Sequence, residues 1–146
     1  MKKISFIFVV ISFSLAILSA CKYFENTPSP TEVFKSHYKA ELKKDISMLK
    51  QNLSKNSLKS IKETSQRLDM DEEYLIENSL GISKSGFPKI RNEKISGDTA
   101  TIELKNDLTG KWDQMPFVKE NGRWKIDLEK FTEDAVKEFN DNQNKF

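Results

Sequence analysis

One histidine and one cysteine are the side chains of this sequence best suited to proton transfer or nucleophilic attack near neutral pH. The histidine, His37, is a candidate general base or ligand-binding residue. No partner group can be identified beside it, so we favour the alternative that His37 is a half-exposed helix residue. One histidine and one cysteine do not make a usual zinc site, and no Gly-rich phosphate loop or nucleophile elbow is present. The sequence therefore predicts no catalytic motif, no metal site and no cofactor.

A second candidate for ligand binding is the charged pair Arg91 and Glu93. Without a bulge in their strand, the register places both side chains on the apolar side of a sheet, opposite Leu104 and Ile102. Two charges there would anchor a ligand at the mouth of a cavity. The alternative, which we favour, is a bulge that turns both charges to solvent and Ile90 inward, because unpaired buried charges cost several kcal/mol.

The surroundings of the cysteine, Cys21, indicate an exported protein. A positive end, Met1-Lys2-Lys3, precedes an uncharged apolar run over 4–20 that ends in small residues, as in a secretory signal. The last residues, Leu18-Ser19-Ala20-Cys21, resemble the lipobox of bacterial lipoproteins. That resemblance implies cleavage before Cys21 and acylation of its thiol and new amino group, palmitate being a typical acyl chain. Residues 1–20 are then a lipoprotein signal peptide, and 21–28 are the lipidated cysteine and a flexible tether.

Two alternatives to lipidation are weaker. The apolar run is about the minimum length for a transmembrane anchor, and its small-residue end before a cysteine fits cleavage better. An accidental cysteine in a secreted protein would be a lone thiol open to stray pairing. We therefore expect a lipid-anchored protein of the cell envelope, facing the periplasm or the exterior. Lys22 is not the aspartate associated with inner-membrane retention in enteric-type lipoproteins, which favours the outer membrane if the source is Gram-negative.

Composition limits the partners of the processed chain. The 146 residues include 24 basic and 22 acidic ones, and loss of 1–20, with Lys2 and Lys3, leaves 126 residues with 22 of each. This is the size of one domain, which we place at 29–146. A formal balance of zero gives no net field to attract nucleic acid or an anionic membrane surface. Without a second cysteine there is no disulfide framework, so the fold depends on its core.

Helices are predicted first along the chain. Ser29 and Glu32 form a capping box, with Pro30 at the first helical position. The helix that follows runs to about Lys44, and its apolar stripe contains Phe34, Tyr38 and Leu42. Three more helices begin at Asp45, at Ser54 and at a capping box of Asp69 and Glu72, and the last of them is stopped by Gly81.

Strands follow from about Lys89. Ala100, Ile102 and Leu104 alternate with polar residues, as in a half-buried strand. Asn121-Gly122 predicts a type I′ hairpin turn, whose register puts Met115, Phe117, Trp124, Ile126 and Leu128 on one face. A loop over 107–110 pairs Ile102 with Met115 and sends Trp112 outward with Lys105. From about Glu129, the spacing of Phe131, Ala135 and Phe139 predicts a C-terminal helix that lies on the domain.

Helices before an antiparallel sheet indicate an α+β domain. Pro30–Phe34, Gly97–Ile102 and Val118–Ile126 resemble lipoproteins of unknown function in the nuclear-transport-factor-2-like superfamily. The resemblance spans roughly 28–130 and implies N-terminal helices packed on a curved, cone-like sheet. It favours a non-catalytic domain that binds a small ligand, a peptide or an envelope protein. The alternative is a small-molecule isomerase or dehydratase that uses His37 or a carboxylate inside the cone. A homodimer through the outer sheet face is a third alternative, although that face is polar.

Overall fold

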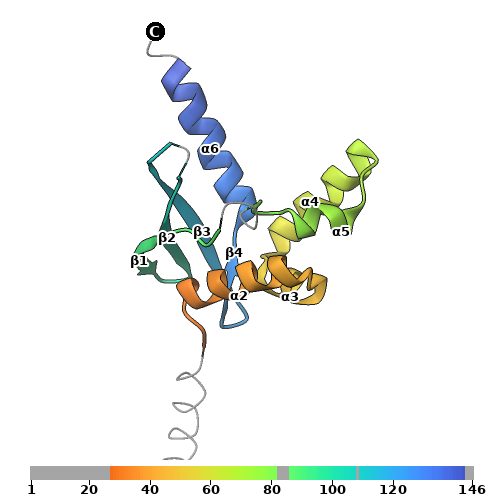
Figure 1. Cartoon of the computed structure of the whole chain (residues 1–146), viewed down its shortest axis with the longest axis horizontal. Helices are drawn as coiled ribbons and strands as arrows, with labels where there is room; N and C mark the ends of the chain where they lie inside the picture. The colour runs from red at the N-terminus through yellow and green to blue at the C-terminus, as the bar shows by residue number, and fades with distance from the viewer. Residues whose placement is uncertain (1–26, 82–85, 108, 144–146) are drawn as a thin grey trace, which may run out of the picture.

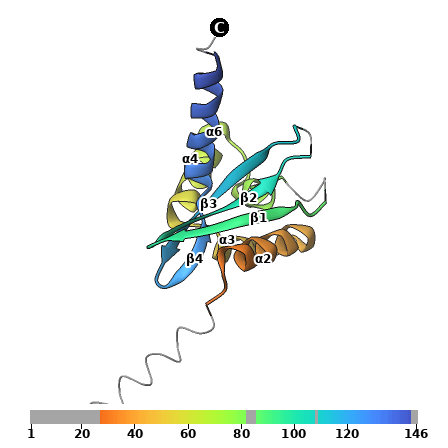
Figure 2. The same cartoon turned by 90° about the vertical axis from the view of Figure 1, so that its left-hand side faces the viewer.

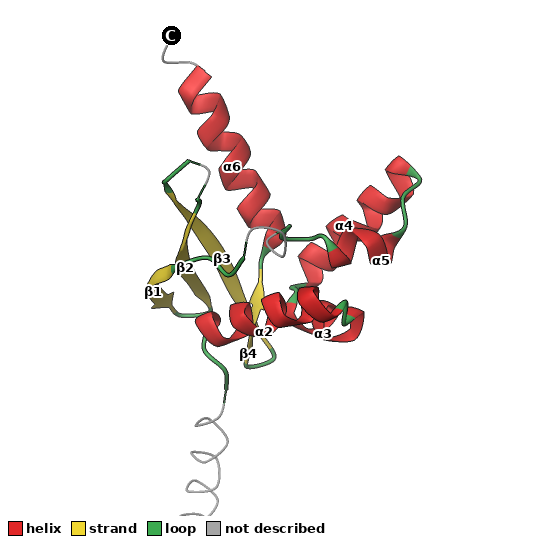
Figure 3. Ribbon diagram, in the orientation of Figure 1, coloured by secondary structure: helices red, strands yellow, loops and turns green. Residues whose placement is uncertain are grey.

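The structure, a computed structural model, describes residues 27–81, 86–107 and 109–143. The predicted signal peptide and Cys21 lie outside these residues. Within them the chain is a mixed α+β domain of five helices and one open, four-stranded antiparallel sheet with the order β1-β2-β3-β4 (Figures 1 and 3). The helices are α2 (Pro30–Lys43), α3 (Ile46–Asn52), α4 (Lys55–Leu68), α5 (Glu72–Glu77) and α6 (Leu128–Gln143). The strands are β1 (Ile90–Ser96), β2 (Thr99–Lys105), β3 (Trp112–Glu120) and β4 (Arg123–Ile126).

Local capping signals determine where most of the helices begin. The Glu32 N–H donates to Ser29 Oγ at 3.3 Å and the Ser29 N–H donates to Glu32 Oε2 at 2.8 Å, so the predicted capping box of α2 is confirmed. The predicted caps of α3 at Asp45 and of α4 at Ser54 are also confirmed.

The predicted cap of the fourth helix is wrong. Asp69 ends α4 in the left-handed conformation, with φ of 50°, and Asp71 caps α5 by accepting the Tyr74 N–H. Aspartate both tolerates the left-handed region and caps helices, so two aspartates close together gave an ambiguous signal. The helix also ends at Glu77, earlier than the predicted stop at Gly81.

The buried face of α2 differs from the predicted stripe. Phe34 is fully buried, but Tyr38 is only half-buried and Leu42 is 56% exposed. The residues that α2 buries are Pro30, Val33, Phe34, His37, Ala40 and Glu41. The helix is therefore rotated about its axis relative to the prediction, and the rotation takes one histidine and one glutamate into the interior.

The register of the sheet confirms the predicted hairpins. Asn121 and Gly122 have positive φ, and Glu120 pairs with Arg123 across them, as a type I′ turn requires. Strands β2 and β3 pair Ile102 with Met115, and Trp112 lies opposite Lys105, also as predicted. The register of the β3–β4 hairpin ends at Ile126, because β4 ends there and Leu128 instead begins α6, from which it still packs against the main core.

Strand β1 contains the bulge that we favoured. Its register against β2 shifts between Arg91 and Lys94, and Asn92 in the bulge has φ of 52°. Both Arg91 and Glu93 are exposed, while Ile90 pairs with Leu104 and packs against the core. The inward-facing arrangement of the two charges is therefore wrong.

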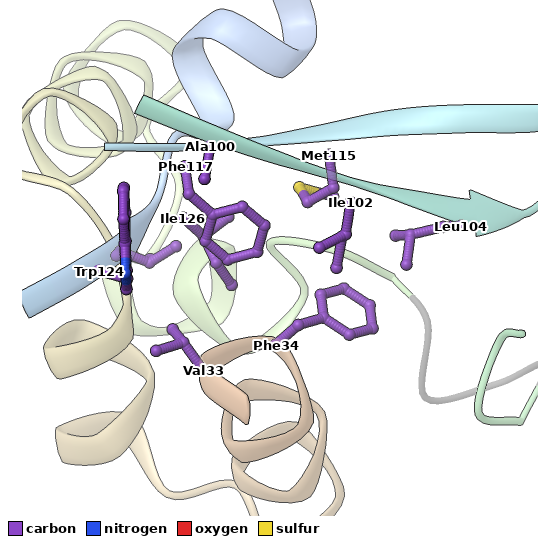
Figure 4. Packing of buried hydrophobic residues seen from close by; sticks show 10 residues of the cluster. Val33, Phe34, Ala100, Ile102, Leu104, Met115, Phe117, Trp124 and Ile126 are labelled. Atoms are coloured by element: carbon purple, nitrogen blue, oxygen red, sulfur yellow. The ribbon is translucent and has the colours of Figure 1, made fainter. Parts of the chain in front are cut away.

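The main core lies between α2 and one face of the sheet. Val33 and Phe34 face the side chains that the sheet contributes (Figure 4). The sheet residues are Ala100, Ile102, Leu104, Met115, Phe117, Trp124 and Ile126, and Leu53 completes the cluster. Figure 2 shows α2 and α3 on the same side of the sheet. A second, smaller cluster of Ala40, Leu49 and Ile76 joins α2, α3 and α5.

Helix α6 follows β4 and packs on the core at its beginning. Leu128 and Phe131 contact the main core, whereas Val136 is 54% exposed. Beyond these turns the helix extends away from the sheet (Figure 1). The side chains of Ala135 and Phe139, from which the prediction of a helix lying on the domain was made, lie outside the described residues. Among the helices that the structure describes, none has the length and apolar composition needed to cross a membrane.

Candidate functional site

A cleft lies between α6 and the α4–α5 pair. Its volume is about 910 Å³, and it lies where α6 diverges from α4 and α5 (Figure 1). The apolar lining comes from Ile61, Leu75, Leu128 and Val136. The polar lining comes from Ser57, Ser60, Thr64, Asn78, Ser79, Thr132 and Asn140, and the charged lining from Glu129, Glu133 and Lys137. A mixed lining of this kind suits a ligand that offers both apolar and hydrogen-bonding groups.

Ser57, at the base of the cleft, connects its two walls. The Ser57 hydroxyl donates to the Ile126 carbonyl oxygen at 3.3 Å and accepts the Leu128 N–H at 2.8 Å. Its oxygen also lies 2.7 Å from Ser54 Oγ, which caps α4. One fully buried side chain therefore joins the beginning of α4 to the beginning of α6 and helps to set the angle between them.

Replacing Ser57 with alanine is expected to lower the free energy of unfolding by about 1–3 kcal/mol, because the partly buried Leu128 N–H loses its acceptor. Urea denaturation of the Ser57→Ala protein measures this loss. The matched control is Ser60→Ala, one turn further along α4, where a half-buried serine lines the same cleft. A change of less than about 0.5 kcal/mol is expected for the control. Equal losses in the two variants would contradict the role of the Ser57 network.

His37 is fully buried, so the expectation of a half-exposed residue is wrong. Its Nε2 lies 3.2 Å from Ser79 Oγ and 3.8 Å from Glu41 Oε1, and the same glutamate oxygen accepts the Leu80 N–H at 3.1 Å. These contacts hold the segment after α5 against α2. Because Ser79 also lines the cleft, the buried histidine supports one wall of the candidate site from behind.

The geometry around His37 does not assemble a Ser-His-acid relay. In such a relay the hydroxyl and the carboxylate use opposite ring nitrogens, but here Ser79 and Glu41 both approach Nε2. Nδ1 is buried and has no hydrogen-bond partner among the described residues. Burial lowers the pKa of His37 from 6.5 to about 4, far below the range useful to a general base near neutral pH. The arrangement positions a segment of the chain against α2.

Lowering the pH from 7 to 5 is expected to remove about 2 kcal/mol from the free energy of unfolding through His37 alone. Below pH 6.5 the unfolded chain binds a proton on this imidazole, whereas burial keeps the folded imidazole neutral until about pH 4. Stability is therefore lost as the pH falls through this window. Urea denaturation at both pH values measures this loss, and the difference in the free energy of unfolding between pH 7 and pH 5 should be smaller for His37→Gln than for the wild-type protein. An equal difference in the two proteins would assign the pH dependence to other groups.

Arg91 and Glu93 do not meet His37 or each other in one site. Arg91 Nε donates to Glu103 Oε2 at 2.6 Å, and this hydrogen bond lowers the pKa of the Glu103 carboxyl. The Arg91 guanidinium also stacks 3.9 Å above the Trp112 ring. Glu93 instead accepts the Thr31 N–H at 2.8 Å, one of the N–H groups that the first turn of a helix leaves without an intrahelical partner. Both charges therefore have structural partners.

Sequence reasoning missed the burial of His37 and its contact with Ser79, as well as the role of Ser57, and each carries only a weak signal in the sequence. Val33, His37, Ala40 and Glu41 are spaced as one helical face, but a face that includes histidine and glutamate looks solvated until its partners are known. Ser79 contacts His37 from 42 positions further along the chain, and no local pattern indicates such a contact. Ser57 lies in the first turn after the predicted Ser54 cap, and the sequence indicates nothing further about its contacts.

The described residues contain no group of three or more His, Cys, Asp or Glu side chains arranged to hold a metal ion. Comparisons of the chain with protein-family models, with curated proteins and with solved structures found no match. The description of the candidate site therefore depends on the sequence and structure of this chain alone.

Proposed function

We propose that this protein is a membrane-anchored bacterial lipoprotein whose folded domain is a non-catalytic binding module. The lipobox-like Leu18–Cys21 supports the anchor, and on the Lys22 argument the outer membrane is the proposed address in a Gram-negative source. The cleft between α6 and the α4–α5 pair carries the binding part of the proposal. The buried, low-pKa His37 supports a structural rather than a catalytic use of the one histidine.

The fold proposal extends the resemblance to lipoproteins of the nuclear-transport-factor-2-like superfamily. Helices that precede an antiparallel sheet and cover one of its faces support it, and so does the β1 bulge, since bulges increase the twist of a strand. In this proposal the sheet is a cone-like surface partly enclosed by α2. The ligand cleft lies outside that surface, next to α6.

A peptide segment of an envelope protein is the occupant that the cleft fits best. Its walls are helices, and apolar Leu128 and Val136 of α6 alternate with Thr132 along one helix face. Side chains that recur along a helix in this way can contact successive residues of a bound peptide. A small apolar molecule would need a more enclosed pocket to bury most of its surface.

Photo-crosslinking from inside the cleft tests the proposal. A benzoylphenylalanine at Val136 places the reactive group in the cleft, and one at Ile95 provides a control on the edge strand β1. The two native side chains are equally exposed, at 54% and 56%. Irradiation of intact cells should give a discrete adduct for the protein with benzoylphenylalanine in place of Val136, identified by mass spectrometry. The protein with the same substitution at Ile95 should give no such adduct. The same adducts from both positions, or none from either, would overturn the cleft as the binding site.

A further inference from the structure

Three lysines form a basic face on α2. Lys35, Lys39 and Lys43 are spaced four residues apart, so they lie on one side of the helix. All three are exposed, opposite the buried side that contains Val33 and His37. They line a groove of about 390 Å³ between α2 and α3, whose floor includes the partly exposed Met48. We call these three lysines the basic face.

The charges of the basic face are not balanced by its neighbours. The structure records no ion pair for any of the three lysines within 27–81, 86–107 and 109–143, whereas Lys44, Lys50, Lys59 and Lys130 each have an acidic partner. Two acids, Glu32 and Asp45, line the same groove. Each accepts a backbone N–H at a helix N-terminus, from Ser29 and from Met48. The positive end of the helix dipole partly offsets those two negative charges.

Helix α2, which carries the basic face, lies at the end of the domain where the chain arrives. Residues 27–29 lead directly into α2, and the far end of α6 lies at the opposite end of the molecule (Figures 1 and 2). Only the residues between Cys21 and Ser29 separate the proposed lipid from the helix. Even fully extended, this length of chain spans no more than about 30 Å. A lipidated chain therefore keeps α2 close to the bilayer.

We propose that the basic face lies on the anionic phospholipid surface of the membrane that holds the lipid anchor. This inference depends on the anchoring part of the proposed function and adds an orientation to it. With α2 against the membrane, α6, which lines the cleft, extends away from the bilayer (Figure 1).

A formal charge of zero on the processed chain does not oppose this orientation. Charges further apart than about 8 Å are largely screened at physiological salt, so the local charge of the face decides the interaction. Each lysine near an anionic surface favours contact by about fivefold. Three lysines together favour the docked orientation over a freely rotating one by about a hundredfold.

Methionine oxidation by chloramine-T, a water-soluble oxidant, tests the docked orientation. The mature acylated protein is reconstituted in vesicles of phosphatidylcholine alone or with about 30 mol% phosphatidylglycerol. Met48 lies in the groove beside the basic face, and Met70 lies in the turn between α4 and α5; they are 36% and 37% exposed. The ratio of Met48 to Met70 oxidation should be at least fivefold lower on the anionic vesicles than on the vesicles of phosphatidylcholine alone. It should recover in about 1 M salt, where the screening length is only about 3 Å.

A triple variant at Lys35, Lys39 and Lys43, each changed to Gln, should abolish the protection of Met48. The matched control changes the exposed Lys62, Lys89 and Lys94 to Gln and should retain it. Loss of protection in both triple variants, or equal Met48 oxidation on the two kinds of vesicle, would overturn the docked orientation while leaving the anchor in place. Failure of the wild-type protein to remain with neutral vesicles would instead overturn the anchor itself.

Discussion

The Cys21→Ser protein is expected to incorporate no palmitate and to accumulate as a precursor that keeps residues 1–20. Without the thiol there is no atom to carry the first acyl chain, and cleavage in the lipoprotein family accompanies this modification. The loss of label is expected to be close to complete. Loss of the acyl chains also weakens membrane retention, since each chain contributes about 0.8 kcal/mol per buried CH₂. Metabolic labelling with palmitate and mass spectrometry of the N-terminus measure both outcomes.

Lys22→Ser is the matched control for the anchor. It changes the neighbouring residue and leaves the Leu18–Cys21 motif intact, so labelling and cleavage should persist. Recovery of the native chain from the cytosol, unacylated and with its first twenty residues, would contradict the anchor. It would also remove the basis for placing the basic face on a bilayer.

The parts of the fold that could be predicted are those decided by neighbouring residues. The Ser29–Glu32 capping box satisfies N–H groups within one turn, and the Asn121-Gly122 turn fixes its register through two positive φ angles. In the second case the alternating apolar residues independently required the same register. Agreement between two local signals made these predictions secure.

The candidate site could not be predicted because its parts come from distant segments. The cleft depends on the angle between α4 and α6, and Ser57 helps to set that angle through Ile126 and Leu128. Nothing in the sequence near Ser57 indicates those partners. The bulge in β1 is a related case, since only the cost of burying charge distinguished it from regular pairing. The single shift moved Arg91 and Glu93 from a hypothetical cavity to the surface.

The rotation of α2 also has a physical cause outside the helix. The predicted stripe of Phe34, Tyr38 and Leu42 and the buried face containing Val33 and His37 are both acceptable helical faces. The sheet and the segment after α5 select the second face, because Ser79 and the Leu80 N–H provide hydrogen bonds to the buried His37 and Glu41. Buried polar groups are tolerated where they have such partners. The same rotation exposes Lys35, Lys39 and Lys43 on the opposite side.

Replacing Phe34 with alanine is expected to lower the free energy of unfolding by about 3–5 kcal/mol, a large part of the total stability of a domain of this size. Phe34 is fully buried and packs between α2 and the sheet (Figure 4), so its removal leaves a cavity in the main core. The matched control is Leu42→Ala in the same helix. Leu42 belongs to the same predicted stripe but is 56% exposed, so a change within about 0.5 kcal/mol is expected.

Urea denaturation followed by circular dichroism at pH 7 measures both variants, and the ratio of the two losses distinguishes the two faces of α2. If Tyr38 and Leu42 formed the buried stripe with Phe34, both alanine variants would destabilise the domain by similar amounts. The rotated helix instead requires a loss at Phe34 several times larger than that at Leu42. Equal losses would contradict the rotation that takes His37 and Glu41 into the interior.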